Sequence, residues 1–216
     1  YNGLKFSGPS GGPVPPAVTD RIETRVSELL AQPEAPYPPV AEMEAKGLVV
    51  RIDPRPTYLN RLRELVDLNA IAAARLKVAV DLLYGTARGY LDQILLEAGC
   101  DVHTMHDGRN PAFGGLTPDP SEENLRELAA VVRAGGFHLG LATDGDADRY
   151  GIIDREGRFI EPNYILALLL GHLITTRGWR MGVARSVATS HLVDAVARQH
   201  AVPVYETNVG FKYLGD

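Results

Sequence analysis

The stretch at residues 137–154 reads F-H-L-G-L-A-T-D-G-D-A-D-R-Y-G-I-I-D and places an acidic loop between two apolar runs. The apolar runs, residues 138–143 and 150–153, each predict a strand. Between them, three aspartates alternate with small residues. Carboxylates this close repel one another unless a cation lies between them, and oxygen ligands favour Mg²⁺, Ca²⁺ or Mn²⁺ over Zn²⁺. The loop therefore predicts a divalent-metal site. Its predicted ligands are Asp144, Asp146 and Asp148.

Other kinds of acidic loop are tested by their spacing. An EF-hand counted from Asp144 requires glycine at the sixth position and glutamate at the twelfth, where this sequence has Arg149 and Arg155. A phosphatase of the haloacid dehalogenase type expects a small hydroxyl or apolar residue two positions after its second aspartate. Tyr150 stands two positions after Asp148, so that loop fits poorly. The EF-hand is excluded, and an ordinary solvated hairpin stays open as an alternative.

Length and composition indicate an ordinary globular protein. The chain has 216 residues, of which 45% are hydrophobic and 23% charged, and this length predicts one or two domains. A net charge of −5 without a basic stretch argues against nucleic acid as a partner. The most apolar segment, residues 164–174, is shorter than the ~20 residues of a membrane span. The single cysteine, Cys100, excludes an internal disulfide and predicts a reducing, cytoplasmic location.

Periodicity and turn residues predict alternating strands and helices along most of the chain. The predicted strands are residues 4–6, 48–52, 76–82, 101–106, 137–143, 150–154, 158–160, 181–187 and 202–206. Helices are predicted to begin near Pro15, Tyr58, Gly85, Ser121, Pro162 and Ser190. Residues 33–39 are too rich in proline for either element and predict a linker, and residues 175–178 predict a second break.

The alternation between residues 76 and 176 predicts one α/β unit. Its fold class is a three-layer α/β/α domain whose mixed sheet is largely parallel, with functional residues at the carboxyl ends of the strands. The acidic loop follows one such end. The G-T-A-R-G turn at residues 85–89 lacks the Lys-Ser/Thr of a phosphate-binding P-loop and is interpreted as structural. His103 and His106 are expected on opposite faces of a strand, and only His191 is expected to face a cleft.

The sequence D-G-D-A-D-R between two strands resembles the metal loop of the α-D-phosphohexomutases, the superfamily of phosphoglucomutases and phosphomannomutases. Y-N-G-L-K at residues 1–5 is similar to a segment that follows the family's phosphoserine loop, Thr-x-Ser-His-Asn-Pro. A-R-S-x-x-T-S at residues 184–190 and V-G-F-K at residues 209–212 resemble the family's third domain. The resemblance covers nearly the whole chain.

The resemblance implies that the chain is a piece of a longer protein, with partial copies of similar domains flanking a complete one. Residues 1–45 would be the end of domain I, residues 46–176 domain II with the metal loop, and residues 177–216 the start of domain III. It also implies a phosphoryl transfer that interconverts hexose 1-phosphate and hexose 6-phosphate through a phosphoserine and a bisphosphate intermediate. The substrate would be a phosphosugar, with neither a nucleic acid nor a membrane as partner.

The resemblance assigns roles to individual residues. The aspartates would hold one Mg²⁺, with hexose 1,6-bisphosphate as activator. Lys5 would lie beside the phosphoserine as a phosphate-binding or acid–base residue. Arg149, Gly210 and Lys212 would contact phosphate, although an ordinary surface lysine is the alternative for Lys212. The nucleophilic serine is absent from the chain, so these 216 residues alone are expected to be inactive.

Two other functions stay open at the level of sequence. One is a metal-dependent phosphatase or sugar-nucleotide enzyme that uses an Asp-x-Asp loop. The other is a non-catalytic module that binds a divalent ion. Their products distinguish them, because a phosphatase releases free phosphate, a mutase isomerises the sugar phosphate, and a binding module does neither.

Overall fold

The computed structural model describes residues 4–9, 11–33 and 38–214, without the side chains of Phe211 and Lys212. The chain divides into two compact units. One unit is Ile52–Ile165, and the other combines Tyr1–Arg51 with Leu166–Asp216.

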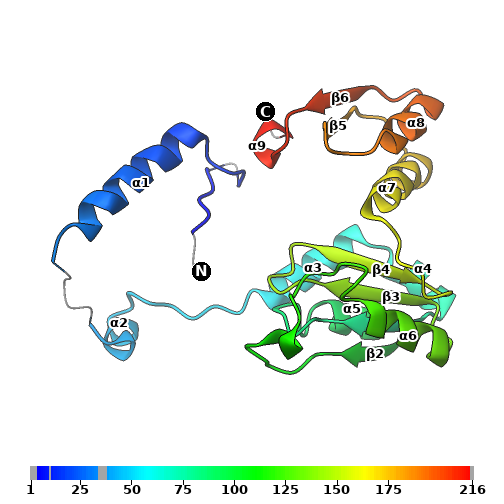
Figure 1. Cartoon of the computed structure of the whole chain (residues 1–216), viewed down its shortest axis with the longest axis horizontal. Helices are drawn as coiled ribbons and strands as arrows, with labels where there is room; N and C mark the ends of the chain where they lie inside the picture. The colour runs from blue at the N-terminus through cyan, green and yellow to red at the C-terminus, as the bar shows by residue number, and fades with distance from the viewer. Residues whose placement is uncertain (1–3, 10, 34–37, 215–216) are drawn as a thin grey trace. The chain divides into compact units, whose positions relative to one another are not determined.

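A four-stranded sheet forms the centre of the Ile52–Ile165 unit (Figure 1). Its strands are β1 (Lys77–Asp81), β2 (Asp101–Met105), β3 (Leu139–Thr143) and β4 (Tyr150–Asp154). The strand order is β2-β1-β3-β4. Strand β1 runs parallel to both β2 and β3, whereas β4 pairs antiparallel with β3. The predicted mixed and largely parallel sheet is confirmed.

Helices cover both faces of this sheet. They are α3 (Arg55–Leu65), α4 (Leu68–Ala74), α5 (Leu91–Glu97) and α6 (Arg126–Gly135). Leu128 and Val132 of α6 pack with Ala79 of β1 in one core cluster. Side chains of α3 and α5 pack with Val78 and Val80 of the same strand in a second cluster. Because successive residues of a strand point to opposite faces, β1 contributes to both clusters, and the predicted three-layer α/β/α class is confirmed.

The predicted helix over residues 58–74 is two helices, α3 and α4. Asp67 breaks it, because its Oδ1 accepts a hydrogen bond from the amide of Ala70 at 3.0 Å and caps α4. The strand predicted at residues 48–52 was wrong. Leu48 and Val50 are largely exposed there, and the described residues place no strand beside them.

The helices predicted from Gly85 and Ser121 begin later, at Leu91 and Arg126. Before α5, Gly89 has a positive φ of 75°, which a helix does not accept, and its amide donates to Oδ1 of Asp92 at 2.8 Å. Before α6, the side-chain amide of Asn124 donates to the carbonyls of Thr117 and Asp119 and holds an irregular turn. Side-chain to backbone bonds of this kind compete with helix formation.

Two further boundaries differ from the prediction. Residues 158–160 form no strand but join β4 through a single bridge between Ile153 and Phe159. Helix α7 (Pro162–Arg177) continues through the break predicted at residues 175–178 as far as Arg177. The hydroxyls of Thr175 and Thr176 donate to carbonyls one turn back, so these threonines remain within the helical hydrogen-bond pattern.

The other unit contains a strand–helix–strand motif. Strands β5 (Val183–Ser186) and β6 (Val204–Thr207) are parallel, with α8 (Leu192–Gln199) between them in sequence and α9 (Phe211–Leu214) after β6. The buried Arg185 of β5 donates to both carboxylate oxygens of Asp194 and to Glu206, each at 2.7 Å. Arg185 foremost, and His191 next, hold the pKa of Asp194 below its usual range. His191 therefore belongs to the ion cluster that ties α8 to the two strands.

The N-terminal part of that unit contains α1 (Pro16–Leu30) and α2 (Val40–Ala45). Pro15 occupies the N-cap of α1 and Pro16 its first turn, as predicted. Residues 4–6 form no strand, and Ser7 and Pro13 share an isolated bridge. Residues 1–3 of the Y-N-G-L-K match and most of the predicted linker at 33–39 lie outside the described residues. No helix within the described ranges has the length and apolarity of a membrane span.

Candidate metal centre

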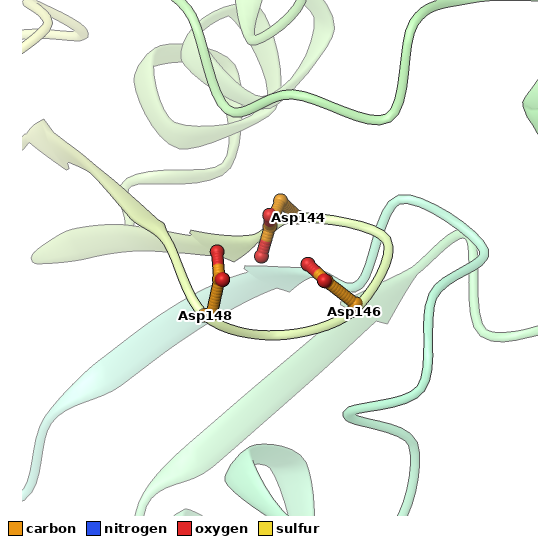
Figure 2. A group of neighbouring side chains, drawn as sticks. All are labelled: Asp144, Asp146 and Asp148. Carbon is orange, nitrogen blue, oxygen red and sulfur yellow. The ribbon is translucent and has the colours of Figure 1, made fainter. Parts of the chain in front are cut away.

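Three carboxylates converge in the loop between β3 and β4 (Figure 2). Asp144, Asp146 and Asp148 each offer an oxygen, and these oxygens all lie within 4.8 Å of one another. Asp144 is buried at the end of β3, whereas Asp146 and Asp148 are exposed. The predicted ligands are thus brought together at the carboxyl edge of the sheet.

The loop closes on itself by hydrogen bonds around Asp144. The amide of Arg149 donates to Oδ1 of Asp144 at 2.9 Å, and the amide of Ala147 donates to the Asp144 carbonyl at 3.2 Å. Ala147 has a φ of 63°, a left-handed conformation that is uncommon for a residue other than glycine. The small side chain allows this turn, and the turn directs the alternate aspartates into the same space.

Neighbouring turns support the loop from outside. The amide of Thr86 donates to the carbonyl of Gly145 at 3.1 Å, and the amide of Gly145 donates to the carbonyl of Pro118 at 3.0 Å. Gly85 lies so close that a Cβ atom there would sit 2.7 Å from the carbonyl oxygen of Asp144. The turn after β1 is therefore in direct contact with the backbone of Asp144, the buried predicted ligand.

Changing Gly85 to alanine is expected to displace the metal loop, because the backbone fixes the position of the new Cβ and the obstructing oxygen is a backbone carbonyl, so neither can rotate away. We expect a loss of about 1–3 kcal/mol of stability and about tenfold weaker Mn²⁺ binding, as for other residues that orient metal ligands. Chemical denaturation and calorimetric titration measure the two effects. Gly108→Ala is the matched control, since nothing lies within 4 Å of a Cβ at that position. Wild-type Mn²⁺ affinity in Gly85→Ala would contradict the contact.

The electrostatics of the loop favour a cation. Burial raises the pKa of Asp144, and the nearby Asp146 and Asp148 raise it further, against the opposing hydrogen bond from the Arg149 amide. The guanidinium of Arg149 lies 3.9 Å from Asp144, 3.8 Å from Asp148 and 2.8 Å from Asp119. Its hydrogen bond to Asp119 is the main reason that the pKa of Arg149 is raised. One exposed arginine thus lies within 4 Å of three carboxylates.

The donor set fits a hard divalent cation. All the converging atoms are carboxylate oxygens, which Mg²⁺, Mn²⁺ and Ca²⁺ prefer. A bound cation would offset the repulsion among the aspartates and favour the ionised form of Asp144. With two of the three carboxylates exposed, the site is open to solvent or to a substrate oxygen.

Comparison with known protein families decides what kind of chain carries this loop. The family description "Phosphoglucomutase/phosphomannomutase, alpha/beta/alpha domain II" matches residues 56–157, and the corresponding domain III description matches residues 161–216. The two ranges together cover well over half of the chain. The chain belongs to the phosphoglucomutase/phosphomannomutase family.

Individual members of the phosphoglucomutase/phosphomannomutase family match almost the whole chain. Phosphoglucomutase-like protein 5 of Mus musculus is 31% identical over 99% of this chain and 42% of its own length. A phosphoglucomutase/phosphomannomutase of Thermococcus kodakarensis is 32% identical over 97% of this chain and 44% of its own length. The chain therefore spans less than half the length of these curated relatives.

Solved structures of the same family share the fold. A putative phosphomannomutase from Thermus thermophilus matches 74% of this chain and 37% of its own with a TM-score of 0.66 and 28% identity. The open form of the phosphoglucomutase pp63/parafusin from Paramecium matches 76% of this chain and 31% of its own, with a TM-score of 0.65 and 28% identity.

The other site residues that the phosphoglucomutase/phosphomannomutase resemblance predicts are divided between the two compact units. Arg149 lies beside them, but Lys5 and Gly210 belong to the other unit, and their proximity to the metal loop stays a prediction. Lys5 is exposed, and Gly210 has a φ of 131° and borders a cavity of about 580 Å³ lined largely by α7, β5 and α8. The side chain of Lys212 lies outside the described residues.

Two polar residues near the loop were given no part in the site by the sequence. Asp81 stands inside the apolar strand run at residues 76–82 and is 1% exposed, with Oδ1 2.9 Å from Nδ1 of His106. The signal in the sequence was a carboxylate within an otherwise apolar strand, because a buried charge needs a partner. His106 lies one residue beyond β2 with a φ of 49°, so the alternation of the strand no longer sets its direction.

Proposed function

We propose that this chain supplies the metal-binding domain of a phosphohexomutase, an isomerase that interconverts hexose 1-phosphate and hexose 6-phosphate by phosphoryl transfer. The observation that supports it is the convergence of Asp144, Asp146 and Asp148 at the carboxyl edge of the sheet, in a chain of this family. Phosphoryl transfer depends mainly on positioning and on neutralising charge, which such a loop can serve.

The aspartates would hold one Mg²⁺, which when bound would act as a Lewis acid toward phosphoryl oxygens. Arg149 offers a planar guanidinium beside the same carboxylates and can donate to a phosphate from there. Lys5, Gly210 and Lys212 are proposed to contact phosphate in the assembled enzyme, Lys5 beside the phosphoserine. Lysine suits that place because its ammonium donates up to three hydrogen bonds.

The wider features of the enzyme are proposed on the same basis. The substrate is a phosphosugar, the activator a hexose 1,6-bisphosphate, and the location cytoplasmic. Residues 1–45, 46–176 and 177–216 are proposed to belong to domains I, II and III, respectively. The support is the family membership, together with the separate compactness of Ile52–Ile165.

The test uses the longest polypeptide that the same reading frame encodes, called here the parent protein. With Mg²⁺ and glucose 1,6-bisphosphate, it is expected to convert glucose 1-phosphate or mannose 1-phosphate to the corresponding 6-phosphate. Asp146→Asn is expected to slow this conversion by about 100-fold, since loss of a ligand costs at least as much as loss of a residue that orients one. Release of free phosphate would favour a phosphatase instead, and metal binding without turnover would favour a binding module.

A further inference from the structure

A buried polar pair lies at the carboxyl ends of β1 and β2, apart from the three aspartates. Oδ1 of Asp81 accepts a hydrogen bond from the amide of Leu83 at 2.9 Å and lies 2.9 Å from Nδ1 of His106. An ionised carboxylate can only accept hydrogen bonds, so Nδ1 of His106 is the donor in the arrangement in which Asp81 is ionised. The other ring nitrogen, Nε2, faces the carboxylate of Glu127 of α6 at 3.6 Å.

Asp81 and His106 hold the turn that follows β1 in place. Leu83 and Tyr84 both have positive φ, and such conformations persist only where the surroundings hold them. Asp81 holds Leu83 through its amide, and the carbonyl of His106 accepts from the amide of Tyr84 at 2.9 Å. The ring of Tyr84 also lies on the ring of His106, with centroids 4.7 Å apart. Asp81 and His106 thus fix two consecutive strained residues from two sides.

The same turn continues directly into the contacts with the metal loop. Gly85 follows Tyr84 and abuts the carbonyl of Asp144, and the amide of Thr86 donates to the carbonyl of Gly145. Asp144 carries the buried carboxylate of the site. An unbroken chain of short contacts therefore runs from the imidazole of His106 to the backbone of the buried ligand.

We propose that Asp81 and His106 are positioning residues for the metal loop: the pair locks the turn at residues 83–86, and the turn sets the place of Asp144. This inference rests on the proposed metal site. It assigns no contact with metal or substrate to either residue. Loss of the hydrogen bond between them is expected to leave the three aspartates present but less well aligned.

The experiment is Mn²⁺ titration of the full chain, followed by the paramagnetic resonance signal of free Mn²⁺. His106→Ala removes the imidazole and is expected to weaken Mn²⁺ binding about tenfold, the usual effect of losing a partner that orients a ligand. His106→Asn places an amide nitrogen near the position of Nδ1 and is expected to restore affinity to within about twofold of wild type, because it can still donate to Asp81. His103→Ala, on β2 itself, is the matched control and is expected to bind as wild type does.

A second measurement on the wild-type chain needs no substitution. Titration with diamagnetic Mg²⁺ is expected to shift the nitrogen resonances of the Leu83 amide and of the His106 imidazole, and to leave the His103 imidazole unchanged. A merely structural pair would not respond to the ion. Absence of these shifts at saturating Mg²⁺ would overturn the proposal even if His106→Ala fails to fold.

The possible results distinguish a failure of the positioning role from a failure of the proposed metal site. The metal site stands if wild type binds Mn²⁺ and Asp146→Asn does not. If His106→Ala then binds Mn²⁺ as tightly as wild type, the positioning role is wrong. If His106→Asn binds as weakly as His106→Ala, the hydrogen bond to Asp81 is not what positions the loop, and the proposal also fails. If wild type and Asp146→Asn bind equally, the metal site itself is refuted, and the positioning role falls with it.

Discussion

Changing Asp144 to asparagine is expected to lower the affinity for Mn²⁺ by about 100-fold or more, because loss of a ligand's charge exceeds the 10–100-fold cost of losing an orienting partner. The asparagine oxygen keeps the acceptor for the Arg149 amide, so the loop retains its closing hydrogen bond. Calorimetric titration measures the affinity. Asp101→Asn, an exposed site at the opposite end of the sheet, removes the same charge and is expected to bind as wild type does.

The same substitution is expected to stabilise the metal-free protein. Burial raises the pKa of Asp144 in the folded state, so the folded chain holds a proton there more tightly than the unfolded chain. Stability from this group is therefore present at low pH and is lost as pH rises through the raised pKa. Above that range, at neutral pH, Asp144→Asn in EDTA is expected to unfold at a higher denaturant concentration than wild type, and Mg²⁺ to reverse the order.

Three results would contradict these predictions for Asp144→Asn. Retention of wild-type Mn²⁺ affinity by Asp144→Asn would remove the buried carboxylate from the ligand set. Equal weakening by Asp101→Asn would show that net charge, and not the geometry of the loop, governs binding. A destabilised Asp144→Asn in EDTA would show that the carboxylate makes a favourable contact in the metal-free state.

A polypeptide of these 216 residues is expected to convert no glucose 1-phosphate to glucose 6-phosphate. The proposed mechanism hands on a phosphoryl group from a serine, and no Thr-x-Ser-His-Asn-Pro stretch occurs in the sequence. Ser7 lies near Lys5 in sequence, but it is exposed in an irregular Gly/Pro-rich segment without that context. The chain also lacks a Gly-Glu-x-Ser-Gly-like stretch, which the family resemblance assigns to sugar binding, and orientation contributes a large share of such rates.

The measurement is a coupled assay for glucose 6-phosphate with Mg²⁺ and glucose 1,6-bisphosphate. The parent protein is the positive control, and a serine-to-alanine change in any Thr-x-Ser-His-Asn-Pro loop it contains is expected to reproduce the inactivity. Folding of the 216-residue polypeptide is checked by its Mn²⁺ affinity, so that an inactive result is not confused with an unfolded one. Turnover comparable to that of the parent protein would refute the assignment of the nucleophile and the proposed mechanism.

Local patterns in the sequence predicted the fold class and the convergence of the three aspartates. Alternating apolar runs and helical faces indicated a largely parallel sheet, and the structure has β1 parallel to both of its neighbours. The spacing of Asp144, Asp146 and Asp148 predicted their convergence, because a turn between paired strands brings alternate residues into one space. These features depend on residues close together in the chain, so the sequence alone suffices to recognise them.

Two helices, α5 and α6, begin later than the sequence predicts, because local contacts hold the turns that precede them. Helix α5 begins at Leu91 because Gly89 takes a left-handed conformation and its amide donates to the side chain of Asp92. Helix α6 begins at Arg126 because side-chain amide bonds of Asn124 hold the preceding turn. In both places the backbone is held by partners that the periodicity of apolar residues does not register.

The support of the metal loop was decided by tertiary structure alone. In the sequence, Asp81 is one residue of an apolar strand and His106 is an isolated histidine. The parallel pairing of β1 with β2 places the two side by side. The sequence indicates only that Gly85 is a turn residue. The pairing of β1 with β3 brings it against the carbonyl of Asp144. Spacing within a loop determines which residues can bind a metal, but the register between distant strands determines what holds that loop in place.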